Sequence, residues 1–435
     1  MANTIKLTEI GKYTTGAFDQ GAAEISAYDS ASKRLFVVNA QAASIDILDL
    51  SDPTSPVKIS QIAVGAFGAV ANSVAVKNGT IAVAVEAVDK TNPGKVVFYD
   101  ANGTYLKDVQ VGALPDMLTF TPDGSKVLVA NEGESATVDP EGSVSIIDLS
   151  GGVNNLTQAN VTTAGFTSFN GSEAQLRTDG VRIFPGKTAA QDFEPEYIAV
   201  AANGQTAYVT LEENNSVAVI DIPTATVTEV QPLGLKDHSL AGNGLDASDR
   251  DSAIAINTWP VSGMYMPDAI ATFGANGQTY YVTANEGDDR GENRSVRTLA
   301  LDPTVFPNAA TLKLDANLGR LSVSGIDGDT DGDGDYDKLY AYGARSFSVW
   351  DSQGNLVYDS GDDFEQMTAQ LFPANFNASN DNNTFDNRSD NKGPEPEGIV
   401  VGKVGDRTYG FIGLERIGGV MAYDITNPNS PQFVQ

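Results

Sequence analysis

One short pattern recurs along the 435 residues of the chain. An acidic or Asn residue opens a β-branched strand, a turn follows, a second strand ends in Asn or Glu, and a third strand closes on Asp. The copies begin at Glu24, Asn72, Asp116, Glu194, Asp268 and Glu395, and a degenerate copy runs from Asp337 to Asp351. Each copy alternates with period two and is too small to bury its own hydrophobic faces. Radial stacking buries such faces, so the repeat predicts an all-β propeller.

The spacing and number of the copies predict how the ring is built. The first three copies start 48 and 44 residues apart, which fits four-stranded blades. The seven copies predict a seven-bladed propeller in a single domain, residues 1–435, with eight blades as the alternative. The last residues, DITNPNSPQFVQ, repeat part of the segment after the first copy and stop as an outer strand begins. We expect an N-terminal strand, residues 5–13, to close the last blade.

Long segments between the copies are rich in Gly, Asn and Asp. They occupy roughly residues 150–191, 232–266, 288–325 and 352–393. The sequence DDFEQMTAQLF, which follows Gly361, predicts a short helix inside the last of them. We expect these insertions to form loops and caps on one face of the propeller, where function concentrates.

Charge and residue usage restrict the chemistry. The 27 basic residues stand against 57 acidic residues, a net charge of −30, so phosphate backbones and anionic membranes would repel the chain. There is no Cys and only one His, His238, which we expect in a surface loop. Catalysis would therefore depend on carboxylates, Arg, Lys, Ser or Thr, or hard metal ions. No stretch approaches the ~18 apolar residues of a membrane-spanning helix, and the N-terminus lacks the pattern of a secretion signal.

The segment DGDTDGDGDYDKL, residues 327–339, carries the sharpest local motif. Acidic residues at alternating positions, with Gly between them, suit the six to eight oxygen ligands of Ca²⁺. The segment is not an EF-hand, because Lys338 occupies the position of the bidentate Glu. The pattern resembles the calcium hairpin loops of integrin-type propeller repeats. We expect a structural Ca²⁺ site formed by Asp329, Asp331, Asp333, Asp335 and Asp337; a solvated acidic turn is the alternative.

A second set of carboxylates is spread over the copies. Residues that open one strand and close the next would meet near the central channel, where close carboxylates raise one another's pKa unless a cation neutralises them. The residues that we predict to bind metal there are Glu196, Asp268, Glu286, Glu397 and Glu415. The alternative is that these acids simply face water.

A few basic residues stand next to these acids. They are Arg290, Arg345, Arg388, Lys392 and Arg416. A cation together with Arg or Lys side chains suits a phosphoryl group, whose oxygens both can hold. We predict that this set clamps phosphate; the alternative is that each cation only neutralises its acidic neighbours. The segment LDASDRD, residues 245–251, could bring three further Asp side chains to the same face or form a helix cap.

Several longer motifs together resemble one known family. They include DFEPEYIAV, LDASDRD, WPVSGMYMPDAIATF, YYVTANEGDDR, YGARSFSVWD, RSDNKGPEPEG and GLERIGGVMAYDITNP. The chain thereby resembles the choice-of-anchor I domain family, secreted or surface bacterial β-propellers that include atypical cyanobacterial alkaline phosphatases without a signal peptide. The resemblance covers nearly the whole chain. It implies calcium-dependent hydrolysis of phosphomonoesters outside the cytoplasm, whereas family members often continue into a further repeat that is not seen after Gln435.

Two functions follow as hypotheses. The first is an extracellular or periplasmic phosphomonoesterase, in which a metal-activated water attacks phosphorus and the Arg and Lys residues hold the phosphate. The second is a non-catalytic calcium-binding module of the cell surface or matrix, which would contact a surface polymer. Calcium is the expected cofactor in both, a further metal such as iron is left open, and we expect neither nucleic acid nor a transmembrane segment.

Overall fold

The computed structural model describes residues 5–18 and 20–435, and in them strands form seven sheets. Six sheets have four strands each, and we call them the first to sixth blades. The first three blades are β1 (Ser26–Asp29), β2 (Arg34–Asn39), β3 (Ser44–Asp49), β4 (Val57–Ala63); β5 (Ala71–Lys77), β6 (Thr80–Val85), β7 (Pro93–Asp100), β8 (Tyr105–Ala113); and β9 (Pro115–Phe120), β10 (Lys126–Asn131), β11 (Ser143–Asp148), β12 (Val161–Gly165). The other three are β13 (Pro195–Val200), β14 (Thr206–Leu211), β15 (Ser216–Asp221), β16 (Thr226–Pro232); β19 (Ile270–Ala275), β20 (Gln278–Asn285), β24 (Ser346–Asp351), β25 (Leu356–Asp359); and β26 (Pro396–Val404), β27 (Arg407–Leu414), β28 (Val420–Asp424), β29 (Gln432–Phe433).

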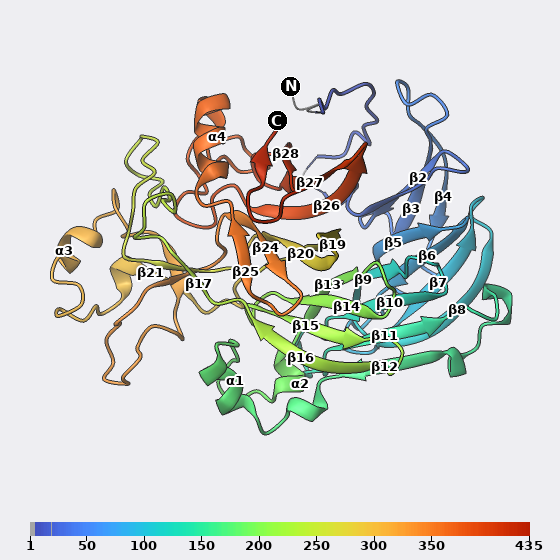
Figure 1. Cartoon of the computed structure of the whole chain (residues 1–435), viewed down its shortest axis with the longest axis horizontal. Helices are drawn as coiled ribbons and strands as arrows, with labels where there is room; N and C mark the ends of the chain where they lie inside the picture. The colour runs from blue at the N-terminus through green and yellow to red at the C-terminus, as the bar shows by residue number, and fades with distance from the viewer. Residues whose placement is uncertain (1–4, 19) are drawn as a thin grey trace.

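The innermost strands lie next to one another in chain order, which makes the sheets blades of a propeller. Strand β5 contacts β1 and β9, β13 contacts β9 and β19, and β19 contacts β26. Neighbouring strands within each blade are antiparallel. Figure 1 shows the sheets following one another around the molecule. The all-β propeller predicted from the repeat is confirmed.

The seven copies do not each form a blade. The copy that begins at Asp268 supplies β19 and β20, and the degenerate copy 337–351 supplies β24, which pairs directly with β20. The two copies therefore complete one four-stranded sheet, and the insertion 288–325 separates its second strand from its third. The expectation of one blade for each copy is wrong at this point, because a long insertion splits the fifth blade.

The seventh sheet is built from two insertions and from the start of the degenerate copy, which supplies its middle strand, β23. Its five strands, in the order β17-β18-β23-β22-β21, are β17 (Leu235–Asp237), β18 (Ser262–Met264), β23 (Tyr340–Ala341), β22 (Ser322–Ser324) and β21 (Asn293–Ser295). The helices of the insertions are η1 (Val153–Asn155), η2 (Gln158–Asn160), η3 (Thr167–Phe169), α1 (Glu173–Asp179), α2 (Ala189–Asp192), η4 (Val296–Thr298), α3 (Ala309–Leu312), α4 (Asp363–Leu371) and η5 (Pro373–Asn375). Helix α4 lies where the sequence predicts one. Two parts of the predicted insertions, β12 and β25, are instead outer blade strands.

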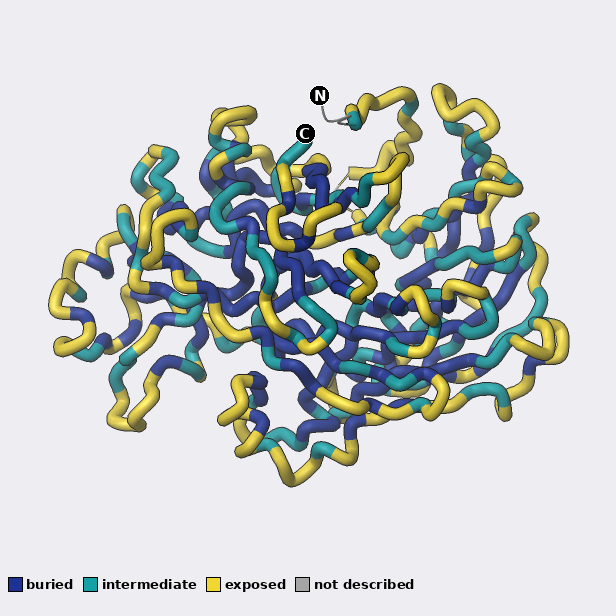
Figure 2. Tube along the Cα trace, viewed as in Figure 1, coloured by how far each residue is buried: buried dark blue, intermediate teal, exposed yellow. Residues whose placement is uncertain are grey.

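The hydrophobic core lies between the blades. Alternate residues of each strand face a neighbouring blade, so Phe36, Val38 and Ile45 of the first blade pack with Val83 and Val97 of the second. Turns at the strand ends keep this register; Gly124, with φ of +74°, closes one by donating its N–H to the carbonyl of Thr121. Figure 2 shows the buried residues following the strands and the exposed residues following the connecting loops.

The N-terminal segment approaches the chain end without forming a strand. The N–H of Leu7 donates to the side-chain oxygen of Gln435, and the side-chain nitrogen of Gln435 donates to the carbonyl of Leu7, both at 3.0 Å. The outer strand of the last blade is instead β29, which pairs with β28. A strand over residues 5–13 is therefore not observed, because a side chain rather than a strand backbone meets this segment.

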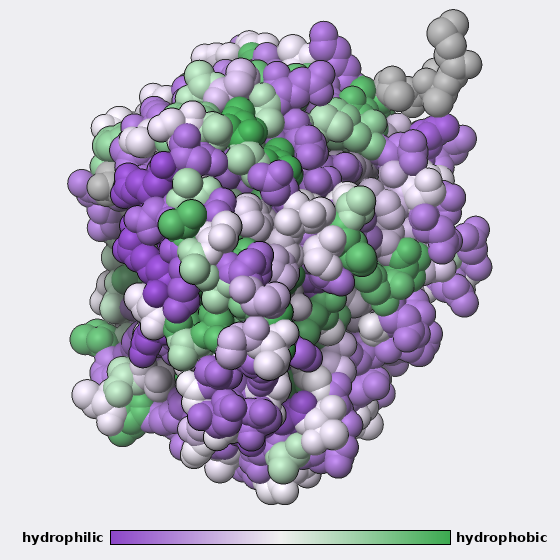
Figure 3. Space-filling model, turned by 90° about the vertical axis from the view of Figure 1, so that its left-hand side faces the viewer, coloured by the Kyte–Doolittle hydropathy of each residue, from purple (hydrophilic) through white to green (hydrophobic). Residues whose placement is uncertain are grey.

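The insertion side of the molecule is mostly hydrophilic, with small hydrophobic patches between the polar side chains (Figure 3). Among the described residues, no helix is both long and apolar enough to cross a membrane.

Candidate metal centre

Carboxylates line the centre of the ring at equivalent positions of three consecutive blades. Glu196 and Glu397 lie at the start of the innermost strands β13 and β26, and Asp268 lies two residues before the innermost strand β19. Glu212, Glu286 and Glu415 directly follow the second strands β14, β20 and β27. Burial, and then Glu286, raise the pKa of Asp268 and of Glu397, and smaller contributions come from Asp116 of the third blade to Asp268 and from Glu24, before the first blade, to Glu397. The predicted convergence of the opening and closing residues is thus present in the structure.

The backbone at the start of these strands is irregular in a repeated way. The pairing of β13 with β14 shifts between Pro195 and Ile198, and that of β26 with β27 shifts between Pro396 and Ile399. Such a β-bulge places two residues opposite one and redirects their side chains. Two residues before the opening carboxylate, Leu114, Met266 and Glu395 have φ of 46°, 43° and 48°, a strained region for large side chains. Bulges and strain together fix where the opening carboxylates lie.

Three groups of carboxylates have oxygens close enough to share a cation. In each, the oxygens lie within 4.8 Å of one another. The groups are Glu196, Glu212 and Asp268; Asp268, Glu286 and Glu397; and Glu286, Glu395 and Glu415. Asp268 belongs to the first two groups and Glu286 to the last two, so the groups form one continuous row. We call it the carboxylate row.

Among the described residues, no Lys or Arg forms an ion pair within 4.0 Å with the first group, and Lys392 acts on Glu212 and Asp268 only from a greater distance. Glu212 is only 5% exposed, and its Oε1 has no hydrogen-bond partner among the described residues. Burial and the neighbouring carboxylates raise the pKa of Glu196, Glu212 and Asp268 well above the usual range. A buried carboxylate oxygen without a donor is costly, and a hard cation would satisfy it. The first group therefore fits Ca²⁺ by the chemistry of its donors.

The third group already has organic cations. Lys392 Nζ lies 3.0 Å from Glu286 Oε1 and 3.3 Å from Glu395 Oε2. Arg416 Nε lies 2.9 Å from Glu395 Oε2 and 3.1 Å from Glu415 Oε2, and Arg388 Nε donates to Glu395 Oε1 at 2.6 Å. Glu395 is fully buried, and despite the burial its cationic neighbours, with Lys392 foremost, lower its pKa. Three predicted phosphate-binding residues thus converge on one carboxylate at this end of the row.

Arg290 lies apart from that cluster. Its guanidinium forms ion pairs with Asp192 at 2.9 Å, Glu194 at 2.7 Å and Glu213 at 3.5 Å, and stacks over the ring of Phe184 at 4.7 Å. Glu194 is 1% exposed, and burial together with Glu213 raises its pKa to about 8. The contacts of Arg290 match the alternative hypothesis, in which it neutralises neighbouring acids.

Arg345 is a structural residue by its contacts. It is 5% exposed, and its Nη1 donates to Glu365 Oε1 at 2.5 Å and to the carbonyl of Asp246 at 2.7 Å. Its Nη2 donates to the carbonyls of Ser389 and Asn391. These bonds tie three separate segments together and direct the donors away from solvent, so the structure does not bring Arg345 to the carboxylate row as a free cation.

The acidic hairpin is divided between two groups. Oxygens of Asp329, Asp331 and Asp333 lie within 4.8 Å of one another, while Asp335 and Asp337 cluster in the same way with Asp302, which lies outside the motif. Within the loop, Asp329 accepts the N–H groups of Gly332 at 2.7 Å and Gly334 at 3.1 Å, and Asp337 accepts that of Thr330 at 2.8 Å. The spacing alone does not show this division, since Asp302 comes from a distant turn.

Several contributors to the row were not singled out by the sequence as metal or phosphate ligands. Glu212 and Glu395 were seen only as members of the repeat, because many acids share the same pattern. The Asn residues before the closing acids are structural: Asn285 donates to the hydroxyls of Ser346 and Ser348, and Asn131 donates in the same way to Ser145. These bonds hold the end of the second strand and so position the Glu that follows.

The six blades and the carboxylate row where their innermost strands meet define the chain as a β-propeller with an acidic centre. It belongs to the choice-of-anchor I domain family, whose model matches residues 24–428.

The chain is similar to two curated animal proteins. It is 29% identical over 283 residues to a mesenchyme-specific cell surface glycoprotein of Strongylocentrotus purpuratus, a match that covers 56% of this chain and 36% of the relative. It is 42% identical over 123 residues to gigasin-3a of Magallana gigas, a match that covers 27% of this chain and 43% of the relative. The chain thus spans less than half the length of either relative.

Solved structures match weakly. Hydrazine synthase of Kuenenia stuttgartiensis gives a TM-score of 0.31 at 15% identity, covering 60% of this chain and 80% of that chain. A nidogen/laminin complex gives a TM-score of 0.31 at 14% identity, covering 49% of this chain and 64% of that chain. The propeller assignment therefore depends on the order of the sheets described above.

Proposed function

We propose that the chain binds a divalent cation, Ca²⁺, at the carboxylate row and hydrolyses phosphomonoesters there. The observation that carries the proposal is the sharing of Asp268 and Glu286 between neighbouring carboxylate groups. Carboxylates shared in this way would hold a metal directly beside the organic cations Lys392 and Arg416, and a metal next to basic side chains suits a phosphate ester. Glu196, Glu212, Asp268 and Glu397 would hold the metal, which when bound supplies a Lewis acid and lowers the pKa of a water molecule.

Basic side chains at the other end of the row would hold the phosphate. The side chains of Arg416 and Arg388 are 27% and 20% exposed, so solvent reaches both guanidinium groups. Lys392 is more enclosed, at 10%. Guanidinium groups bind phosphate oxygens through paired hydrogen bonds, and Lys binds them as a point charge. Glu286, Glu395 and Glu415 pair with these three cations, so a phosphate would have to take over some of their ion pairs.

Turnover of p-nitrophenyl phosphate by the purified chain, with calcium and with EGTA, tests this proposal. We expect calcium-dependent hydrolysis that Arg416→Glu abolishes, because the substitution places a carboxylate against the phosphate. Arg297→Glu is the matched control: its ion pair with Asp315 at 2.9 Å is exposed and lies in an insertion. Equal activity of wild type and Arg416→Glu would remove Arg416 from the site, and absence of turnover in calcium would overturn the proposed activity.

We place this activity outside the cytoplasm, at the cell surface or in the periplasm. Family membership and the similarity to a cell surface glycoprotein of Strongylocentrotus purpuratus support the placement. Protease treatment of intact cells tests it, since an exposed chain is degraded and a cytoplasmic one is protected.

A second candidate function is a non-catalytic calcium-binding surface module. It is favoured by Arg290 and Arg345, two predicted phosphate ligands whose donors are committed to ion pairs and backbone carbonyls. Calcium-dependent melting without turnover of phosphomonoesters would support this function over the first.

A further inference from the structure

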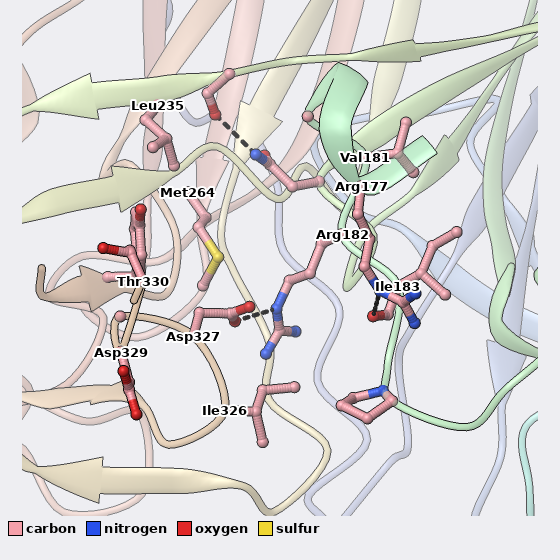
Figure 4. A pocket seen from close by; sticks show the side chains of 16 residues that line it. Arg177, Val181, Arg182, Ile183, Leu235, Met264, Ile326, Asp327, Asp329 and Thr330 are labelled. Carbon is pink, nitrogen blue, oxygen red and sulfur yellow. Dashed lines mark hydrogen bonds and ion pairs between the residues drawn. The ribbon is translucent and has the colours of Figure 1, made fainter. Parts of the chain in front are cut away.

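A cavity of about 630 Å³ lies outside the carboxylate row, between the helix α1 region and the five-stranded sheet. Three parts of the chain meet around it: the segment that follows α1, the strands β17 and β18, and the start of the acidic hairpin. Figure 4 shows side chains from all three pointing toward one another. Cavities that bind small molecules in proteins have about 300 to 1,000 Å³, so the size suits a small organic ligand.

The cavity has an apolar floor and an apolar rim. Val181, Ile183 and Met264 are buried, at 1%, 4% and 3% exposure, and their side chains form part of its lining. Leu235 and Ile326 also line it, but 45% and 40% of their surface is exposed. Two large aliphatic side chains that stay exposed on opposite walls would gain burial if an apolar group entered between them.

Charge is unevenly distributed around the cavity. The positive charge of Arg182 is neutralised by two ion pairs, one with Asp327 at 2.8 Å and one with Glu292. The exposed Arg177 forms no ion pair within 4.0 Å with a described residue, and its Nε and Nη2 donate to the carbonyls of Ile183 and Phe184 at 3.0 Å. Its charge acts more weakly on Glu173, one helical turn earlier, whose pKa is lowered chiefly by backbone hydrogen bonds and also by Arg177. The two bonds hold the guanidinium in place. Asp329 lies on the other side of the cavity (Figure 4).

We propose that this cavity binds a small amphiphilic anion, with its acidic head at Arg177 and its apolar body between Leu235 and Ile326. The head group lies at Arg177 because the acidic hairpin would repel it from the opposite wall. The body covers Val181, Ile183 and Met264. A neutral apolar molecule would bind the same cavity without a contribution from Arg177, which gives the proposal its test.

The test uses two fluorescent probes with the full chain in calcium buffer: 8-anilinonaphthalene-1-sulfonate, an anion, and the neutral N-phenyl-1-naphthylamine. We expect saturable binding of the anion, competition by decanoate, and at least a tenfold loss of affinity for both probes in Ile326→Asp, which puts a charge on the apolar rim. Val88→Asp, at a side chain that is 88% exposed and lies in the second blade, is the control and should bind like wild type.

Arg177→Gln tests the head-group site separately. The substitution should lower the affinity for the anionic probe about five- to tenfold and leave the affinity for the neutral probe unchanged, because only the charged contact is lost. Equal binding of the anion by wild type and Ile326→Asp would overturn the cavity as its site. If Arg177→Gln lowers the affinity for both probes equally, or lowers neither affinity, the assignment of the anionic head to Arg177 is overturned. Circular-dichroism melts of each variant confirm that the fold is intact, and none of these results depends on phosphatase activity.

Discussion

Lys392 places its ammonium 3.0 Å from a carboxylate oxygen of Glu286, joining the last insertion to the end of the second strand of the fifth blade. Burial opposes the charge on Lys392, but Glu286 and Glu395 raise its pKa beyond the ordinary range, so it stays protonated. This ion pair divides the carboxylate row into two parts. Organic cations neutralise the part around Glu395, and the part around Glu212 is left for a metal.

The first prediction concerns the metal-binding part of the row. Glu212→Gln should abolish most of the calcium-dependent rise in melting temperature, because it removes a charged ligand at unchanged volume. Without calcium the variant should melt at or above the wild-type temperature, since it relieves repulsion among buried carboxylates. Differential scanning calorimetry in calcium and in EGTA measures both effects. Glu134→Gln, at a side chain that is 47% exposed and pairs with Lys90, is the control. An unchanged calcium response in Glu212→Gln would exclude Glu212 as a ligand.

The second prediction concerns the acidic hairpin. Terbium, a luminescent substitute for calcium, should bind near Tyr336, whose ring lies in the same loop and can sensitise its emission. Asp331→Asn should weaken this terbium signal at least tenfold, because it removes a charged ligand from the group of Asp329, Asp331 and Asp333. A luminescence titration measures the affinity. Glu212→Gln, which alters the other site, should leave the Tyr336-sensitised signal unchanged, and a loss of that signal there would contradict two separate sites.

The third prediction assigns a structural role to Arg345. Arg345→Met should lower the free energy of unfolding by about 3 to 5 kcal/mol, because it leaves Glu365, 1% exposed, as a buried charge without its partner. Urea unfolding measures the loss. Adding Glu365→Leu should restore part of it, since no unpaired charge then remains. The exposed pair of Arg297 and Asp315 provides the control, for which Arg297→Met should cost about 1 kcal/mol or less. A cost as small as this in Arg345→Met would contradict the structural role.

The fourth prediction concerns acid sensitivity. His238 is 1% exposed, and its Nδ1 lies 2.7 Å from the carbonyl oxygen of Asn243. Burial, with the charge of Lys236, lowers its pKa to about 3, although Asp237 acts in the opposite direction and Arg345 adds to the lowering. The unfolded chain therefore takes up a proton near pH 6.5 before the folded chain does. The stability that neutral His238 provides is complete above pH 6.5 and is lost toward pH 3, at about 1.4 kcal/mol per pH unit.

The variant His238→Asn isolates this contribution, because its amide nitrogen can still donate to the carbonyl of Asn243. From pH 7 to pH 5, wild type should lose about 2 kcal/mol more stability than the variant, measured by urea unfolding. Parallel losses in the two proteins would show that His238 is not buried in its neutral form.

The sequence predicted the architecture because period-two alternation and regular turns are local signals that every copy carries. The prediction from the sequence was wrong where the chain departs from the repeated pattern. The long insertion before Ser346 hides the fact that β24 completes the sheet begun by β19 and β20, and pairing across more than sixty residues has no local signal. His238 was expected in a surface loop, yet β17 and β18 enclose it, since the insertions form a sheet of their own.

The sequence predicted which acids meet at the site, but not which of them pair with Lys or Arg side chains. The repeat indicated that opening and closing acids meet, and carboxylate oxygens of Glu196, Asp268, Glu286 and Glu397 do lie in groups within 4.8 Å of one another. Some of these acids have Lys or Arg partners that come from loops far along the chain. Lys392 of the last insertion, which pairs with Glu286, is an example, and the repeat does not predict such a pair. The sequence shows Arg345 beside the repeat, but only the fold shows that its donors face Glu365.

Anomalous diffraction from crystals of the chain soaked in terbium would test most directly whether the carboxylate row holds a metal. We predict a peak within about 2.6 Å of oxygens from Glu196, Glu212 and Asp268, the range of calcium-like coordination, in addition to one at the acidic hairpin. Peaks at the hairpin alone, with the channel carboxylates bound only to water, would contradict a metal centre in the propeller channel.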